Sequence, residues 1–389
     1  MRWWILFVLF VARMAMAFQF ASVGATGPLY EQAFGLSAAR LGFLIGLYFL
    51  PGVVVALPGG GLGARFGDKR VLLAGLLLMT LGGGAAAVFD VWSVQVAARV
   101  VAGAGAVLLN VVMTKMVADW FAGREIGTAM AVFVNSYPAG IAVALFGLPV
   151  IATFAGLQAA TMAVAVFALA GLALVALFYG DPPGAPAAAS RPARPMPRGL
   201  ALAAVIAAGL GWGIFNGAFS MFFNFGPANL VERGHDLVSA GTLTSAMIWL
   251  VMAAGILGGI LNDLTGRPLT IYVSASLLSI GGLVAFPVAD NLPLVIAVLG
   301  VGFGLPTSIY MVVGTRGLAG SERALGMGVF YTTYFLVFMV IPYIAGAMID
   351  ASGTTASAFR LAAGLMVLAM ASVGVALWLQ RLRTRRTSA

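Results

Sequence analysis

Long apolar segments constrain the fold of this chain more than any other feature. Of its 389 residues, 62% are hydrophobic and only 8% are charged, whereas a soluble domain carries roughly 25% charged residues. The apolar runs, at about 20 residues each, are long enough to cross the ~30 Å hydrocarbon core of a bilayer as helices. Strands of a membrane barrel would alternate polar and apolar residues, and these runs do not. The chain is therefore predicted to be an all-α membrane protein.

Twelve apolar segments follow one another in two sets of six. A stretch rich in proline, alanine and arginine separates the sets, and because such a composition cannot bury a core, it is predicted to be a flexible linker. We expect an N-terminal half at 1–180, a cytoplasmic linker at 181–199 and a C-terminal half at 200–389 that ends in a short basic tail. The predicted transmembrane helices are 4–27, 38–60, 71–89, 94–117, 127–152, 158–180, 200–225, 238–261, 269–288, 293–314, 325–348 and 356–379.

The first apolar run has two interpretations. Arg2, the apolar residues after it and Ala15-Met16-Ala17 resemble a secretory signal peptide with its cleavage site. The apolar character continues well past Ala17, however, and the second set of six segments requires a matching first helix. We expect an uncleaved first span.

The lysines and arginines indicate how the chain crosses the membrane. With the N-terminus inside, 15 of them fall in cytoplasmic segments, whereas 3 (Arg40, Arg233 and Arg360) fall outside, which is the bias typical of membrane proteins. The net charge of +9 then comes from the cytoplasmic segments, where it sets the topology and can contact anionic lipid. We expect no binding to nucleic acid. The predicted location is the cell (inner) membrane, multi-pass, with both termini cytoplasmic.

A turn rich in glycine and charge occurs at the corresponding place in each half. Between the second and third spans, residues 59–70 read GGGLGARFGDKR, and between the eighth and ninth spans, residues 258–268 read GGILNDLTGRP. The two turns align with an offset of 199 residues, about half the chain. A repeated turn of this kind indicates a duplicated membrane protein, and such proteins bind their substrates between the halves near the bilayer midplane.

The turn, the basic linker and the twelve spans in two halves resemble the major facilitator superfamily, and the resemblance covers nearly the whole chain. The turn motif of that family is G-x-L-x-D-R-x-G-R-(K/R)-(K/R). Ala64 stands where the family has an aspartate, Asp68 stands where it has an arginine, and the second copy keeps Asp263 and Arg267. We therefore expect a charge lock that is weakened or rewired in the first half. The matching positions are Leu62, Arg65, Gly67, Lys69 and Arg70.

Two further segments carry the resemblance. Residues 99–105 (RVVAGAG) resemble the fourth-helix pattern R-x-x-x-G-x-G, and residues 115–130 resemble the segment that joins the fourth and fifth spans. Lys115, near the end of the fourth span, is similar to a lysine of the cyanate-permease-like branch. The resemblance implies a monomeric transporter that rocks between inward-open and outward-open states around a central site.

Fixed positive charge lies inside the predicted spans without fixed negative charge. All 12 acidic residues fall in loops or at helix ends, whereas Arg13, Arg99 and Lys115 fall within spans. A charge in the bilayer costs at least about 2.5–3.5 kcal/mol on insertion scales and is normally paired or functional. The expected partner is an anion from outside the chain, water or helix carbonyls.

Each of these three cations has a structural alternative. Arg13 would have to snorkel from about 14 Å inside its helix, so we expect it to face the central cavity rather than the lipid headgroups. Arg99 suits a hydrogen-bonding brace between helices as well as it suits a ligand contact. Lys115 has Asp119 four residues later, which favours a salt bridge near the inner surface over a ligand role.

Polar and aromatic side chains complete the predicted cavity. A stripe of aromatic residues on the seventh span, from Trp212 to Phe223, is as consistent with helix packing or lipid contact as with a ligand site. The candidate substrate-binding residues besides Arg13 are Gln19, Asn110, Asn135, Tyr137, Asn216, Tyr310, Tyr331 and Tyr334. The candidate gating or structural residues are Arg65, Gly67, Arg70, Arg99, Lys115, Asp119, Asp263 and Arg267.

These features predict a transport protein and not an enzyme. The chain has no cysteine, one histidine and no phosphate-binding glycine loop, so no metal, cofactor or ATP-driven chemistry is expected. The predicted function is secondary active transport of a small organic or inorganic anion by alternating access. The alternative is a multidrug-type exporter of amphipathic or cationic compounds, and the lack of a carboxylate deep in the membrane counts against cationic cargo. That lack also favours anion exchange, uniport or a proton carried by the substrate.

Overall fold

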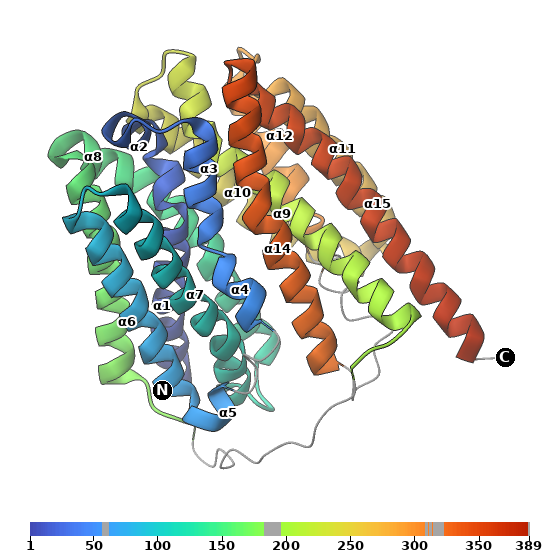
Figure 1. Cartoon of the computed structure of the whole chain (residues 1–389). Coiled ribbons are helices and arrows are strands. Elements are labelled where there is room, and N and C mark those ends of the chain that lie inside the picture. Colours follow the sequence, from blue (N-terminus) through green and yellow to red (C-terminus); the bar gives the residue numbers. More distant parts are fainter. Residues whose placement is uncertain (57–61, 183–195, 308–309, 311–312, 314–322, 388–389) are drawn as a thin grey trace.

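The computed structural model describes residues 1–56, 62–182, 196–307, 310, 313 and 323–387, and nearly all of them lie in helices (Figure 1). The first half contains α1 (Arg2–Ala25), α2 (Gly27–Phe34), α3 (Ala38–Leu47), α4 (Leu50–Val55), α5 (Leu62–Phe66), α6 (Asp68–Val88), α7 (Trp92–Trp120) and α8 (Ile126–Phe178). The second half contains α9 (Leu200–Glu232), α10 (Leu237–Thr265), α11 (Pro268–Ala285), α12 (Leu292–Gly304), α14 (Arg323–Ser352) and α15 (Ala356–Thr387).

The predicted all-α membrane fold with twelve spans is confirmed. Among the described residues, ten helical segments are long and apolar enough to cross a membrane. One of them, α8, holds the two predicted spans 127–152 and 158–180, which are separated by a sharp bend at Gly156 with φ 83°. α12 covers the first part of the predicted span 293–314, and much of the remainder of that span lies outside the described residues.

Prolines and polar caps set several helix boundaries. The second predicted span is broken at Tyr48-Phe49 into α3 and α4, because Pro51 cannot donate a backbone hydrogen bond to the preceding turn. Ser37 caps α3 and Asp236 caps α10, where its carboxylate accepts a hydrogen bond of 2.9 Å from the Ser239 backbone N–H. Such caps satisfy backbone donors that a helix start would otherwise leave free.

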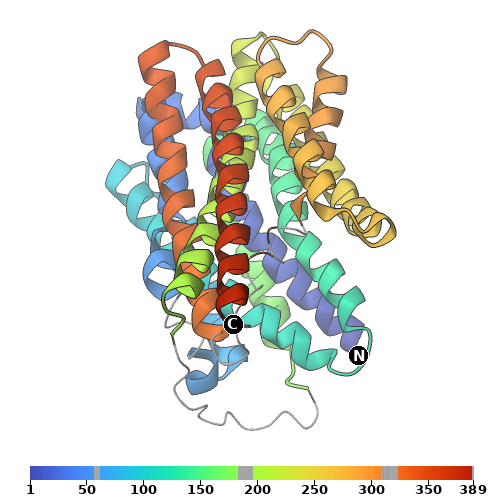
Figure 2. The ribbon, with the colours of Figure 1, turned by 90° about the vertical axis from the view of Figure 1, so that its right-hand side faces the viewer.

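Helices pack mainly with others of the same half. In the first half α1 packs against α8, and α6 against α7 and α8; in the second half α9 packs against α15, and α10 and α11 against α12. Most of the predicted linker, at 183–195, lies outside the described residues. The marked N- and C-terminal ends lie toward the same end of the bundle, opposite α2 (Figures 1 and 2).

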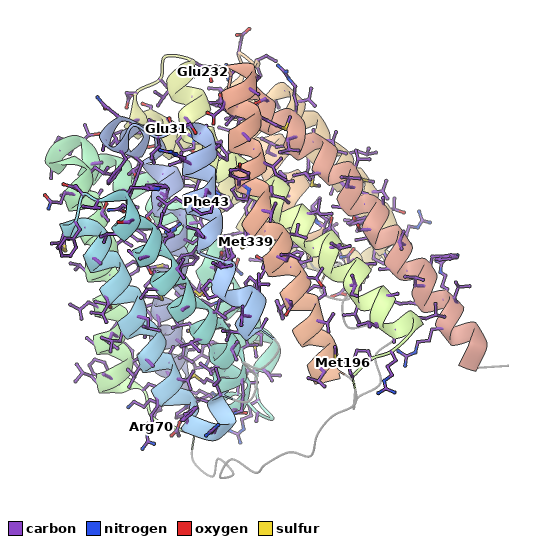
Figure 3. All side chains as sticks on the ribbon, in the orientation of Figure 1. Glu31, Phe43, Arg70, Met196, Glu232 and Met339 are labelled. Carbon is purple, nitrogen blue, oxygen red and sulfur yellow. The ribbon has the colours of Figure 1, made fainter. Side chains whose placement is uncertain are left out.

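The two halves meet closely at the end of the bundle that contains α2, which we call the closed end. There α3 and α14 cross with glycine on both sides of the contact (Figure 1). A Cβ atom at Gly42 would collide with the Pro342 carbonyl group, and one at Gly346 would collide with the Ala38 carbonyl group. Figure 3 shows Glu31 and Glu232 at the closed end, and Arg70 and Met196 at the other.

Candidate substrate-binding site

Arg13 lies in the middle of α1, and its guanidinium group turns toward α8 and α14. Nη1 donates a hydrogen bond of 3.1 Å to the Phe133 carbonyl oxygen. Cζ lies 4.6 Å from the centre of the Phe133 ring and 5.8 Å from that of Tyr137. The phenol groups of Tyr331 and Tyr334, on α14 of the second half, lie close enough to interact electrostatically with Arg13. Tyr137 of the first half thus contacts the predicted arginine, and two predicted tyrosines of the second half lie in its neighbourhood.

The Arg13 charge has carbonyl and aromatic neighbours but no carboxylate partner among the described residues. The ion pairs in that part of the chain join Arg2 to Glu125, and Lys115 to Asp68 and Asp119. The faces of aromatic rings stabilise a guanidinium by about 0.5–2 kcal/mol. They carry no net negative charge, so the charge of Arg13 stays uncompensated. The Arg13 Nε–H is buried and has no hydrogen-bond partner. It can donate to an acidic group that enters from outside the chain.

A set of phenylalanines separates Arg13 from the closed end. This aromatic layer consists of Phe20, Phe49, Phe223, Phe335 and Phe338. The Phe49 and Phe338 ring centres lie 4.3 Å apart, and the Phe20 ring centre lies 5.6 Å from that of Phe223 and 5.7 Å from that of Phe338. These contacts join residues of the first half to residues of the second. Our sequence reasoning missed the layer, because phenylalanine is equally common on lipid-facing helix surfaces.

Four other predicted ligand residues use their polar groups elsewhere. Gln19 donates to the Met79 carbonyl at 2.9 Å, and Asn135 and Asn216 each donate to the carbonyl one turn earlier in their own helix. Tyr310 is buried in the second half, where its hydroxyl lies 3.1 Å from that of Tyr272. Asn110 is half-buried on α7. Among the described residues, no hydrogen bond joins any of these five side chains to Arg13.

The aromatic stripe on the seventh span packs largely inside the second half. The Trp212 ring centre lies 5.4 Å from that of Tyr310, and the Phe215 ring centre lies 5.6 Å from that of Phe303. Only its last member, Phe223, belongs to the aromatic layer. Most of the stripe therefore takes part in helix packing, which is one of the interpretations that the sequence left open.

Arg99 braces three segments of the first half. It is only 6% exposed, and its guanidinium donates to the carbonyl oxygens of Gln19 at 2.7 Å, Phe20 at 2.5 Å and Leu44 at 3.3 Å. Its Cζ also lies 4.7 Å from the centre of the Tyr48 ring. A cavity of about 30 Å³ beside it leaves room for little more than a water molecule. These contacts are those of a hydrogen-bonding brace between helices, one of the two roles that the sequence allowed for Arg99.

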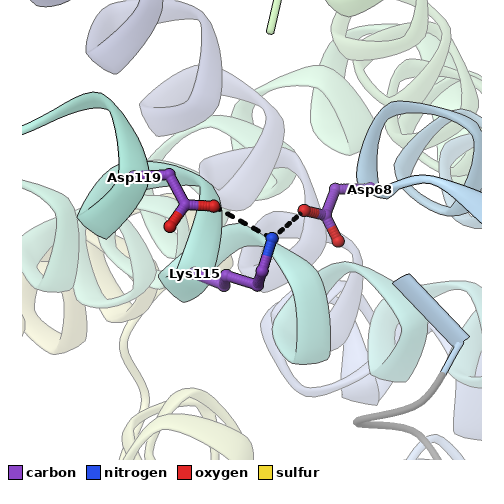
Figure 4. A network of polar contacts seen from close by, with 3 residues as sticks. All are labelled: Asp68, Lys115 and Asp119. Atoms are coloured by element: carbon purple, nitrogen blue, oxygen red, sulfur yellow. Dashed lines mark hydrogen bonds and ion pairs between the residues drawn. The ribbon is translucent and has the colours of Figure 1, made fainter. Parts of the chain in front are cut away.

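Lys115 stands between two carboxylates at the end of the bundle opposite the closed end. It donates to Asp119 at 2.9 Å and to Asp68, which begins α6 (Figure 4). Both partners belong to the first half. Lys115 therefore joins α6 to α7 by a salt bridge, the role that its spacing from Asp119 favoured.

We expect Lys115→Met to lower the melting temperature of the purified protein by about 2 °C at low salt, since it leaves two carboxylates facing each other. All three side chains are at least partly exposed, so the difference should shrink at about 1 M salt, where screening is strong. Arg70→Met is the matched control, because Arg70 is exposed and forms no ion pair among the described residues. A difference independent of salt would mean that the lysine acts by packing.

Comparison with known families decides what class of protein carries this site. Residues 9–319 and 201–389 match the model of the Major Facilitator Superfamily. The chain belongs to the Major Facilitator Superfamily. Superfamily members are membrane transport proteins, so this chain is a multi-pass transport protein. Within the described residues, no group of His, Cys, Asp and Glu has the arrangement of a metal site.

Named superfamily transporters resemble the chain over most of its length. It is 24% identical to the hexuronate transporter of Bacillus subtilis, covering 95% of this chain and 93% of that one. It is 22% identical to the probable sulfoacetate transporter SauU of Cupriavidus necator, covering 90% and 88%. A crystal structure of a bacterial Spinster homologue, inward-facing and occupied, matches with a TM-score of 0.74 at 14% identity over 98% of this chain and 97% of that one. These relatives do not support the cyanate-permease-like branch.

In the first copy of the superfamily turn, Asp68, which departs from the family motif, has an ion-pair partner. Asp68 forms an ion pair with Lys115, while Arg65 lies against its neighbour Phe66 with Cζ 5.2 Å from the ring centre. Gly67 ends the turn with φ 87°, a conformation that glycine adopts without strain. In the second copy, Asp263 and Arg267 are exposed, and neither forms an ion pair within the described residues. Residues 57–61 of the first turn lie outside the described part of the chain.

Proposed function

We propose that this protein is a secondary transporter of a small organic anion with a carboxylate or sulfonate group, and that it works by alternating access. The observation that carries the proposal is the Arg13 guanidinium, which lies between the halves, has an unpartnered Nε–H and forms no ion pair among the described residues. Arg13 holds the acidic group of the cargo, and the hydroxyls of Tyr137, Tyr331 and Tyr334 bind its other oxygens.

The relatives support an organic acid as cargo. Hexuronate and sulfoacetate, which name two of them, are small organic anions: a hexuronate has one carboxylate and several hydroxyls, and sulfoacetate has a sulfonate and a carboxylate. A guanidinium is planar and matches the oxygens of a carboxylate or sulfonate, and it stays charged at every physiological pH. A cationic compound would meet this fixed positive charge without a compensating carboxylate. The geometry around Arg13 therefore favours anion transport over the export of cations.

The state and orientation of the protein form a second part of the proposal. The excess of lysine and arginine in the segments at the end opposite the closed end favours cytoplasmic termini. The closed end then faces outward, and the described conformation is inward-facing. The halves act as the two rocking bodies, joined by a cytoplasmic linker at 181–199. Because no carboxylate pairs with Arg13 in the described residues, we propose exchange, uniport or a proton that travels on the cargo.

A thermal-shift experiment tests the proposed cargo. We expect glucuronate and sulfoacetate to raise the melting temperature of the purified protein by a few degrees, because a ligand at about 100 times its Kd stabilises the folded state by about 2.7 kcal/mol. Glucose and choline serve as controls of similar size that are neutral and cationic. The Arg13→Ala variant should lose the shift. Stabilisation by choline and not by either anion would contradict the proposal and favour the cation exporter.

A further inference from the structure

A carboxylate of the second half caps a helix of the first half at the closed end. Asp350, in the last turn of α14, accepts hydrogen bonds of 2.9 Å from the backbone N–H groups of both Ala38 and Ala39. These are the first two residues of α3, a helix of ten residues. The N-terminus of a helix carries partial positive charge and free N–H groups, so an ionised carboxylate is held there by both.

This cap joins residues more than 300 positions apart in the chain. Ser37 on α3, Asp236 on α10 and Asn291 on α12 bind residues of their own helix start, and the side-chain acceptors at the start of α15, Thr354 and Glu232, belong to the same half as that helix. Asp350 is therefore the described cap that must break when the two halves part at the closed end. The glycine contacts between α3 and α14 bring the two helices close enough for the cap to form.

A second carboxylate lies beside the cap. Glu31, on α2 of the first half, is half-buried and shares with Asp350 a surface cavity of about 370 Å³, which Ser37 and Thr355 also line. The other charged groups on neighbouring elements have their own surroundings. Glu232 on α9 accepts hydrogen bonds from Thr354 and Thr355, and Arg40 on α3 is exposed. Asp350 supplies the like charge that acts on Glu31.

We infer that Asp350 is the latch of the closed end, and that protonation of Glu31 strengthens the latch by removing the negative charge beside it. The inference rests on the proposed alternating access, but not on the identity of the cargo. It gives the two neighbouring acids opposite effects: loss of the Asp350 carboxylate opens this end, whereas loss of the Glu31 charge keeps it closed.

The direction of the pH effect follows from the surroundings of Glu31. Burial first, and the Asp350 charge second, raise the pKa of Glu31 above its ordinary value of 4.5. The closed state therefore favours the protonated form. As the external pH rises from 4.5 through the raised pKa, the closed end loses stability, and opening relieves the repulsion. Low external pH is expected to hold the closed end shut.

The chain has no cysteine, so a single introduced cysteine reports how often the closed end opens. Ser245→Cys suits this purpose, because Ser245 is 3% exposed and donates to the Ala142 carbonyl at 2.9 Å across the halves. Its labelling by a membrane-impermeant maleimide is measured on whole cells between pH 5 and pH 8. We expect Asp350→Ala to raise the labelling rate about tenfold or more, since it removes two hydrogen bonds to a charged group across the halves.

Asp236→Ala is the matched control, because it removes an aspartate cap that lies within one half and should leave the rate unchanged. Asp350→Asn, which keeps an acceptor oxygen without the charge, should be intermediate. Glu31→Gln should lower the rate at pH 8 and remove the rise with pH. If the Ser245→Cys label reacts as slowly in Asp350→Ala as in Asp236→Ala, Asp350 is not a latch. If the labelling rate of Glu31→Gln depends on pH as it does without that substitution, protonation of Glu31 has no role.

Two more single cysteines establish sidedness and integrity. Asp290→Cys, in the exposed connection between α11 and α12, should label in every variant, and Arg381→Cys, near the end of α15, should not. If Arg381→Cys is labelled on whole cells and Asp290→Cys is not, the proposed orientation with cytoplasmic termini is wrong. The labelling experiments are then repeated on inverted membrane vesicles to test the latch. A variant that has unfolded shows a lost melting transition. If Asp350→Ala leaves the labelling of Ser245→Cys unchanged while the anions still raise the melting temperature, the latch is refuted and the proposed cargo is not affected.

Discussion

Arg13→Ala is expected to abolish transport of the organic anion, with at least a hundredfold loss, while the amount of protein in the membrane stays the same. The variant removes the cationic group that neutralises the cargo, and about 2.7 kcal/mol of lost charge-assisted binding already corresponds to a hundredfold. Arg13 makes one hydrogen bond of 3.1 Å and a longer one of 3.5 Å to carbonyls of α8, so its loss should not unfold the helix bundle. Uptake into cells or proteoliposomes is the measurement.

Two further variants show whether the Arg13 effect comes from the guanidinium itself. Arg13→Lys keeps the charge but loses the planar set of donors, so we expect partial activity with a raised KM. Arg381→Ala removes an exposed arginine near the end of α15 and should transport normally. Full transport by Arg13→Ala would remove this residue from the proposed site.

The second large effect is expected at the contact between α3 and α14. Gly42→Val should reduce transport more than tenfold, because the new Cβ would meet the Pro342 carbonyl group and hold the halves apart. Overpacking of this kind costs about 1–3 kcal/mol, enough to shift a two-state equilibrium tenfold or more. The variant should therefore populate the state that is open at this end, and the Ser245→Cys reporter should label faster in it.

Gly84→Val is the matched control for Gly42→Val. Gly84 also lies in a membrane helix, α6, but a Cβ there would meet no atom within 4 Å. Its substitution should leave transport within about twofold, as expected of a change that adds no contact. If both valine variants lost transport equally, the cause would be helix conformation in general and not the approach of α3 to α14.

Hydropathy predicted the helices well because the bilayer allows few alternatives. A run of about 20 apolar residues must satisfy its own backbone there, so its length and position almost determine a helix. The ends of the helices depended on individual residues. The break of the second span at Tyr48-Phe49 follows from Pro51, and the bend at Gly156 inside α8, where φ is 83°, separates the two spans predicted at 127–152 and 158–180.

The candidate site was only partly predictable. Arg13 could be found because a charge deep in an apolar run is costly and therefore noticeable. Tyr331 and Tyr334 share a helix face at i and i+3, which placed them together but did not show that they approach Arg13. Nothing in the local sequence marks Asp350 as a cap for α3, because its partners are backbone groups more than 300 residues away. Contacts of this kind appear only when the halves are assembled.

The first copy of the superfamily turn illustrates a third case. Sequence comparison with the family motif showed that Ala64 and Asp68 depart from the pattern, but not which residue would take over the missing interaction. The structure pairs Asp68 with Lys115, a lysine that the sequence had already linked to Asp119 alone. A departure from a motif can thus indicate that an interaction has moved, while its new partner depends on how neighbouring helices pack.

The aromatic layer has a consequence for how well the membrane stays sealed. Phe335 and Phe338 press against Phe49, with ring centres 6.1 Å and 4.3 Å away, and no hydroxyl or charge belongs to the set. A file of water molecules conducts protons, and phenylalanine rings offer such a file no hydrogen-bond donor or acceptor. With an anion bound at Arg13 as proposed, this layer would hinder proton leakage through the closed end while the carrier is loaded.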